Sequence, residues 1–114
     1  MPTYLVNPPS QFVIPVTRGA DLQFMVNRVD SNNNPVNWNA AVFIAVDAPD
    51  PNFPTTVQAA VNGNQAIILL PMSLNDEVNV RTKWRMYMQI PNGAGTLTSP
   101  VAVGHFERDD GSAP

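Results

Sequence analysis

The sequence of 114 residues contains no cysteine. This absence excludes disulfide bonds, thiolate chemistry and metal sites built on cysteine. It is also what a chain assembled in a reducing cytoplasm would show. Histidine occurs once, as His105, so no cluster of histidines can hold a metal ion.

Charge is scarce as well. Lys, Arg, Asp and Glu together make up 13% of the chain, against about 25% in an average globular protein. The six Lys and Arg residues are spread along the sequence without a basic run, so we expect no nucleic-acid partner. The polar surface must come mainly from neutral side chains, and such a surface suits contact with other proteins.

Long apolar runs are missing too. No stretch approaches the ~20 apolar residues that a membrane-spanning helix needs, so we expect no membrane partner. The first residues, Met1 to Tyr4, lack a charged region followed by an apolar one, and no signal peptide is therefore expected.

Short apolar runs separated by turn residues are what the sequence does contain. Twelve prolines and six glycines interrupt it every few residues, which is typical of an all-β domain. We predict an antiparallel β-sandwich, with an immunoglobulin-like topology as one arrangement open to it, and one short helical turn. Residues 1–10 form an extended N-terminal arm in this prediction, residues 11–108 the sandwich domain and residues 109–114 a C-terminal tail.

Several segments predict individual strands. The ranges are 11–17, 22–29, 40–46, 55–61, 65–70, 83–90 and 96–108. Pro15 places its strand at a sheet edge, because proline cannot donate a ladder hydrogen bond. Asn62-Gly63 is a strong hairpin signal, and Trp84, Met86 and Met88 alternate onto one face as in a half-buried strand. Residues 47–54, with their prolines, are expected to be a loop, and residues 91–95 a glycine-rich turn.

The segment from Met72 to Val80 is the one helical candidate. Ser73 is positioned to cap it, with Asp76 three residues further on. The prolines and asparagines around the segment restrict it to one or two turns.

Catalytic chemistry finds little support. A general base on a serine or threonine needs a histidine with an orienting carboxylate, and no spacing pairs His105 with one. The Asp- and Asn-rich segments 30–34 and 47–52 lack the glycine and closing glutamate of a calcium loop. We therefore expect no enzyme activity, no metal and no cofactor.

Aromatic side chains leave another function open. Trp38, Trp84 and Tyr87 could form a platform on which a sugar stacks, although packing in the core is commoner for an alternating tryptophan. Trp38 lies between Asn37 and Asn39, and we expect it to be the more exposed of the two tryptophans.

Short motifs along the chain resemble those of one protein family. They lie in segments 12–21, 30–36, 70–74, 83–87 and 103–106, and the first reads Phe-Val-Ile-Pro-Val-Thr-Arg-Gly-Ala-Asp. Together they resemble the LtfC-like small β-sandwich proteins of actinobacteriophage virions, from about Phe12 to Arg108. Leu22 stands where that family usually has an aromatic residue. The resemblance implies a minor capsid or minor tail protein without catalytic residues.

From this resemblance we expect a minor capsid or decoration protein that binds and stabilises the capsid shell. Its partners would be the major capsid protein or other virion proteins, with a homo-oligomer also open, and its location the virion, assembled in the host cytoplasm. A minor tail protein and a carbohydrate-binding module for host recognition are the alternatives. The residues expected to contact partners, or else to close over the domain, are Tyr4, Leu5, Val6, Phe53 and Phe106.

Overall fold

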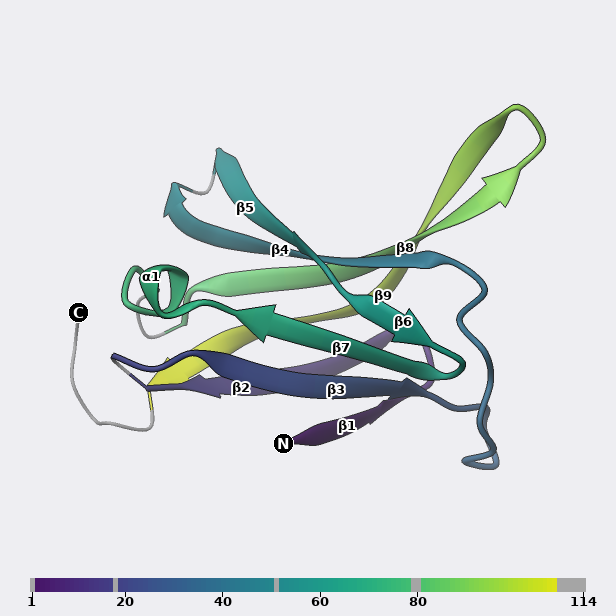
Figure 1. The fold of residues 1–114 in the computed structure, drawn as a ribbon, viewed down its shortest axis with the longest axis horizontal. Coiled ribbons are helices and arrows are strands. Elements are labelled where there is room, and N and C mark those ends of the chain that lie inside the picture. The colour runs from purple at the N-terminus through teal and green to yellow at the C-terminus, as the bar shows by residue number, and fades with distance from the viewer. Residues whose placement is uncertain (1, 18, 51, 79–80, 109–114) are drawn as a thin grey trace.

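Alternating apolar side chains give most strands one buried face, and two sheets pack these faces against each other (Figure 1). The computed structural model describes residues 2–17, 19–50, 52–78 and 81–108. The predicted all-β sandwich with one short helical turn is confirmed. The predicted tail, residues 109–114, lies outside the described residues.

One sheet has four strands and the other has five. The four-stranded sheet runs in the order β1 (Thr3–Val6), β3 (Leu22–Arg28), β7 (Gln65–Leu70) and β6 (Ala60–Asn62). The five-stranded sheet runs in the order β2 (Ser10–Val16), β9 (Gly95–Arg108), β8 (Lys83–Asn92), β4 (Ala41–Asp50) and β5 (Phe53–Gln58). Pro15 lies in β2 at the edge of its sheet, as predicted.

Two strand pairs are parallel, which corrects the expectation of purely antiparallel sheets. β1 pairs with β3 and β2 with β9 in parallel, while the other pairs are antiparallel. The reason lies at the N-terminus, where the chain adds one edge strand to each sheet. Pro8 and Pro9, which cannot donate to a ladder, lie at the crossing between the two strands.

The first ten residues are therefore not a separate arm. The backbone N–H of Met25 donates to the carbonyl of Pro2 at 2.9 Å, and that of Val29 donates to Val6 at 2.9 Å. The Val6 side chain is fully buried in the core. Pro2 precedes β1, and Pro8 and Pro9 lie between β1 and β2, so no proline of this segment interrupts a strand.

The segment 47–54 is not a loop either. β4 continues to Asp50 and β5 begins at Phe53, so the segment forms the end of a hairpin. β5 is an edge strand, so one of its sides has no partner strand. Pro54, which has no backbone N–H to donate, is tolerated at such an edge. The pairing of β4 with β5 shifts its register between Val46 and Pro49.

The expected strand 55–61 divides into two. β5 pairs with β4 in one sheet and β6 pairs with β7 in the other. Ala59 lies at the change of sheet, where its N–H donates to the carbonyl of Val42 at 2.8 Å. The chain thus crosses from one sheet to the other in the middle of the segment that was predicted as one strand.

The helical segment is a single turn, α1 (Met72–Asn75). Ser73 lies inside it, and the cap position is occupied by Pro71, which makes no side-chain cap hydrogen bond. The first helical N–H, that of Met72, donates instead to Oδ1 of Asp21 at 2.7 Å. A residue distant in sequence thus supplies the cap, which local patterns do not reveal.

The core lies between the sheets and draws its buried side chains from every strand except β5 and β6, although the half-buried Val57 of β5 packs against it. Its large side chains are buried, and two of them, Trp84 and Met86, were predicted to share one face of their strand. They include Ile14, Phe24, Val26, Ile44, Ile68, Leu70, Trp84, Met86 and Phe106.

Asp30 organises the turn between β3 and β4. Its Oδ1 accepts the backbone N–H groups of Asn34 at 3.0 Å and Asn32 at 2.8 Å. These hydrogen bonds favour the carboxylate and lower the pKa of Asp30, with the bond from Asn34 the larger cause.

We expect this turn to make the domain less stable in acid. The pKa of Asp30 is lower in the folded protein than in the unfolded chain. Its contribution to the stability of the fold is therefore complete above the ordinary aspartate pKa of about 3.9, and it is lost as the pH falls through the pKa of the folded state. Asp30→Asn should lower Tm modestly at neutral pH, and it should reduce the further fall in Tm that acid causes below about pH 4. Thermal melts of both proteins between pH 2 and 7 measure this, and parallel curves would contradict it.

Candidate interaction surfaces

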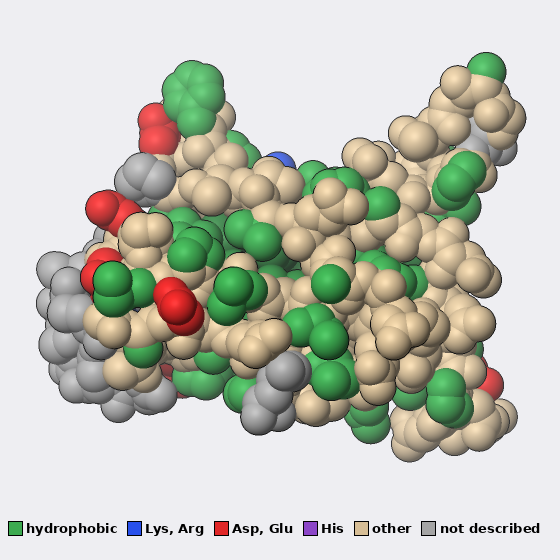
Figure 2. Space-filling model, in the orientation of Figure 1, with side chains coloured by type: hydrophobic (Ala, Val, Ile, Leu, Met, Phe, Trp, Pro, Cys, Tyr) green, Lys and Arg blue, Asp and Glu red, His purple; other side chains and the backbone are tan. Residues whose placement is uncertain are grey.

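Two hairpins of the five-stranded sheet project beyond the body of the sandwich. Figure 1 shows the β4–β5 and β8–β9 hairpins rising at opposite ends of one side, and Figure 2 shows apolar side chains on both projections. Phe53, at the first tip, is 78% exposed, and Leu97, near the second tip, is 53% exposed. The β8–β9 ladder continues outward from Ile90↔Leu97 to Asn92↔Gly95.

Such projections are unusual for an isolated domain. A two-stranded ribbon alone is at best marginally stable in water, because it buries little apolar surface. Large apolar side chains at exposed tips commonly mark contact with another protein. Phe53 was predicted from the sequence as a contact residue and Leu97 was not, although Asn92-Gly93 between two strands is itself a hairpin signal.

An open hollow of about 410 Å³ lies between the two hairpins on the outer face of the sheet. Pro54 and Thr56 of β5 form one wall, and Thr98 and Pro100 of β9 form the other. Tyr87, on the floor, stacks on Phe43 with ring centroids 5.4 Å apart. The hollow is thus bordered by residues of both projecting hairpins.

The predicted contact residues divide into two groups. Leu5 and Phe53 are exposed, as a contact residue must be, with 61% of Leu5 accessible. Val6 and Phe106 are 0% and 1% exposed and belong to the core, so they do not contact a partner, and the alternative expectation, that they close over the domain, applies to them. Both were placed in peripheral segments, but β1 and β9 carry them into the sandwich.

Tyr4 lies between these extremes. Its ring stacks on Phe12 with centroids 4.4 Å apart and meets the edge of Phe24 at 5.8 Å. Burial raises the pKa of its phenol above the ordinary tyrosine value. Tyr4 therefore acts first as a packing residue between the two N-terminal strands.

Neither tryptophan offers a sugar platform. Trp38 is 1% exposed and Trp84 is 2% exposed, so the expectation that Trp38 lies on the surface is wrong. In an extended segment neighbouring side chains point to opposite sides. The exposed Asn37 and Asn39 therefore indicated an inward Trp38, not an outward one.

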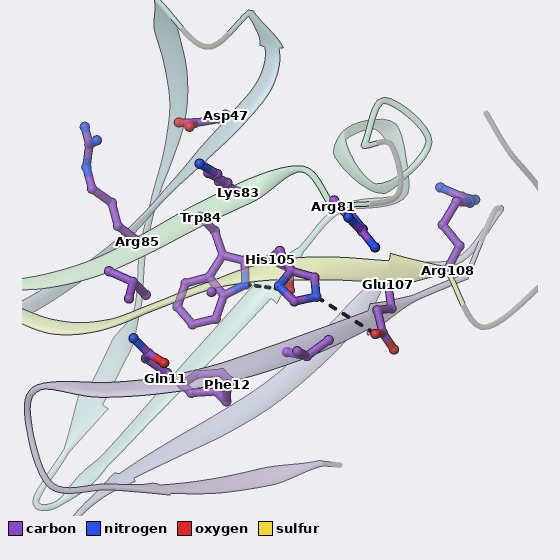
Figure 3. A pocket seen from close by; sticks show the side chains of 13 residues that line it. Gln11, Phe12, Asp47, Arg81, Lys83, Trp84, Arg85, His105, Glu107 and Arg108 are labelled. Carbon is purple, nitrogen blue, oxygen red and sulfur yellow. Dashed lines mark hydrogen bonds and ion pairs between the residues drawn. The ribbon is translucent and has the colours of Figure 1, made fainter.

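Another hollow, with a volume of about 1100 Å³, lies on the outer face of β2, β9 and β8 (Figure 3). Arg81, Lys83 and Arg85 border it on one side, and Asp47 lies beyond them. Phe12, Trp84 and Gly104 form part of its floor, and Gln11, Val13 and Val103 complete the apolar and neutral lining.

His105 lies in this hollow, opposite Lys83 in the β8–β9 ladder. Its Nε2 is 3.9 Å from Oε1 of Glu107, a contact that is an ion pair only when the imidazole is protonated. Across the described ranges, no group of three histidine, aspartate or glutamate residues converges to hold a metal ion. Among the same residues, no helix has the length and hydropathy to cross a membrane.

Comparison with known proteins gives a family and a fold. A family model described as "LtfC-like, beta-sandwich domain" matches residues 8–109. The N-terminal domain of phage TP901-1 ORF48 has a similar structure, with a TM-score of 0.63 at 9% sequence identity. That likeness covers 95% of this chain and 98% of the other. No curated protein matches the sequence.

Proposed function

Because the chain belongs to the LtfC-like β-sandwich domain family, we propose that it is a structural protein of a bacteriophage particle, bound to the capsid shell as a minor capsid or decoration subunit. The family and the shared fold with a phage protein domain support a structural phage role. The low proportion of charged residues and the neutral polar surface support attachment to other proteins.

The two projecting hairpins carry this proposal. A ribbon that ends in an exposed Phe53 or Leu97 gains stability when a neighbouring subunit buries the apolar side chain. The hollow between the hairpins, lined by Pro54, Tyr87 and Pro100, then receives part of the neighbour. Each bound copy stabilises the lattice, because binding favours the assembled state by mass action.

The role is passive in this proposal and requires no catalysis or cofactor. The partner is the major capsid protein or another virion protein. The chain acts in the virion after assembly in the host cytoplasm.

A tail component is the second candidate. The neighbour with the shared fold is named as an N-terminal domain, so it is one part of a longer phage protein. A domain in that position can attach the parts that follow it, as a tail structure requires. Quantitative mass spectrometry of purified particles separates the two candidates. Hundreds of copies per particle indicate the shell, whereas a few or tens indicate the tail.

Removing the two apolar tips should prevent incorporation without unfolding the domain. We expect Phe53→Ser with Leu97→Ser to reduce copies per particle at least tenfold, since central apolar contacts contribute about 2 kcal/mol or more to binding. The Tm should change little, because both side chains are exposed. Copy number in purified particles is the measurement.

Leu69→Ser provides the matched control. Leu69 is 51% exposed but lies on β7, in the opposite sheet. Normal incorporation of this variant is expected. If Leu69→Ser lost incorporation into particles while the Phe53→Ser, Leu97→Ser protein was incorporated normally, the four-stranded sheet would be the one that makes the contact.

A further inference from the structure

The hollow around His105 concentrates positive charge in an acidic protein. Four of the chain's six Lys and Arg residues line it, accompanied by two acids, Asp47 and Glu107. The rest of the chain is left with two cations and seven acids. A net charge of −3 thus conceals a local excess of cations. Such an asymmetry attracts an acidic partner to this face.

Three of these cations are close together in the sequence, and two of them belong to one strand. Lys83 and Arg85 occupy alternate outward positions on β8, and Arg81 precedes Lys83 by two residues. Alternate residues of a strand are separated by roughly 6.8 Å. Over the described part of the chain, none of the three forms an ion pair with an acid.

Arg108, the fourth cation, has a structural task instead. It is 8% exposed, and its guanidinium donates to the carbonyls of Asn75 at 3.2 Å and Val78 at 3.0 Å. It fixes the segment after α1 beside β9. The hollow therefore combines one committed arginine with three exposed cations that face solvent.

Arg81 adopts a backbone conformation that favours glycine. Its φ is 69°, in the left-handed region, and its N–H donates to the carbonyl of Phe106 at 2.9 Å. A side chain in this region costs free energy, and such residues are concentrated at functional positions. The cost is explained if the arginine at this point is needed for its charge.

We propose that this hollow binds an extended acidic segment of a neighbouring virion subunit, with carboxylates at alternate positions facing Lys83 and Arg85 and a further carboxylate facing Arg81. The match rests on the shared period, because an extended segment repeats its outward side chains at the same spacing as β8. The cationic hollow shares Arg85 and Val103 with the hollow between the hairpins, so the two form one continuous surface. The inference rests on the proposed virion role.

A nucleic acid fits this surface less well than a peptide. Asp47 and Glu107 lie within the hollow and would repel a continuous row of phosphates. The tryptophan on its floor is 2% exposed and offers no face on which a base could stack. A peptide can place a basic or neutral residue opposite each acid.

The probe is a fluorescent peptide that alternates glutamate with valine over seven residues. Its anisotropy with the full chain should show binding that weakens as salt is raised. Lys83→Gln with Arg85→Gln should weaken binding about tenfold, since two exposed ion pairs are lost. A control, Ser31→Asp with Asn62→Asp, lowers the net charge equally at two exposed turns and should retain affinity.

Arg81→Gly separates recognition from folding. Glycine relieves the left-handed backbone, so Tm should rise by a few degrees, while affinity for the peptide falls about threefold. Loss of stability in this variant would show that the arginine side chain is there for the fold, and the inference would be wrong.

Three results would overturn the inference. They are equal binding of a peptide that groups the same glutamates at one end, tighter binding of a single-stranded oligonucleotide, and equal weakening by the control variant. The proposed function fails separately, if the wild-type chain is absent from purified particles. A chain that is present in particles but binds no acidic peptide would contradict only the inference about the hollow.

Discussion

Gly104→Ala is expected to lower the free energy of unfolding by about 3 kcal/mol and Tm by roughly 10 to 20 °C. Gly104 lies in β9 directly opposite Trp84. A Cβ at this position would collide with the carbonyl oxygen of Phe12 and lie 2.7 Å from Cζ2 of the Trp84 ring. The first obstacle is backbone, so β2 itself would have to move.

Gly95→Ala is the matched control for this prediction. Gly95 begins the same strand, and an added Cβ there would meet no atom within 4 Å. The substitution should leave Tm unchanged or raise it slightly, because alanine restricts the unfolded chain. Thermal and urea unfolding of the two variants measure the difference. A Gly104→Ala protein as stable as the Gly95→Ala protein would show that β2 and β9 are not in the tight contact described.

The contact at Gly104 also connects the fold to the proposed surface. The indole Nε1 of Trp84 donates to the carbonyl of His105 at 3.1 Å, and the Phe12 ring lies 4.6 Å from the indole. These residues form part of the floor of the cationic hollow. The missing side chain at Gly104 thus allows β2, β9 and β8 to form one rigid base beneath Lys83 and Arg85.

The sequence predicted the features that depend on local alternation. Trp84, Met86 and Met88 are buried on the inner face of β8, as their spacing indicated. Pro15 indicated an edge strand, because its ring removes a donor. These predictions succeed because each depends on a single strand and on which of its faces is apolar.

Predictions failed where distant segments decide the outcome. Asp21 caps α1 from 51 residues away, and no local motif reveals this contact. The position of β1 depends on pairing with β3, so an arm and an edge strand look alike in sequence. Phe106 was expected either to contact a partner or to close over the domain, and in the folded chain it is buried in β9, which pairs with β2.

The candidate surface was the least predictable feature. Phe53 was recognisable as an apolar residue among prolines. How far its hairpin projects from the sandwich depends on how far β4 and β5 continue to pair, which the sequence does not show. The cationic hollow needs the register that sets Lys83 opposite His105 and Arg85 opposite Val103. In the sequence three of the cations, Arg81, Lys83 and Arg85, already stand at alternate positions. Only the folded sheet shows that Arg108 and residues of β2 line the same hollow.

Binding through both the hairpins and the hollow has an energetic consequence. A neighbour held by Phe53 and Leu97 presents any attached acidic segment to Lys83 and Arg85 at high effective concentration. Each exposed ion pair is weak alone, at about 0.2–1 kcal/mol, so the hollow adds specificity and register more than total affinity. The apolar tips should therefore control incorporation, and the cations should control the orientation of the bound subunit.

Trp38 is the subject of the other large expected effect. Its indole is buried beside Arg28, whose guanidinium carbon lies 5.8 Å from the ring centroid. Trp38→Ala should lower the free energy of unfolding by about 3–5 kcal/mol, because it leaves a large cavity. Measurement by urea unfolding should show a lower midpoint with an unchanged slope.

Phenylalanine substitutions test why Trp38 is there. Within the described residues, Nε1 of Trp38 is buried without a hydrogen-bond partner, whereas Nε1 of Trp84 donates to His105. Trp38→Phe should therefore cost less than Trp84→Phe by about 1–2 kcal/mol, because only the second substitution removes a hydrogen bond and leaves its acceptor unpaired. Equal costs would mean that the Trp38 N–H has a partner in the folded protein. The smaller cost would show that Trp38 is kept for its packing volume, which a sugar-binding role does not require.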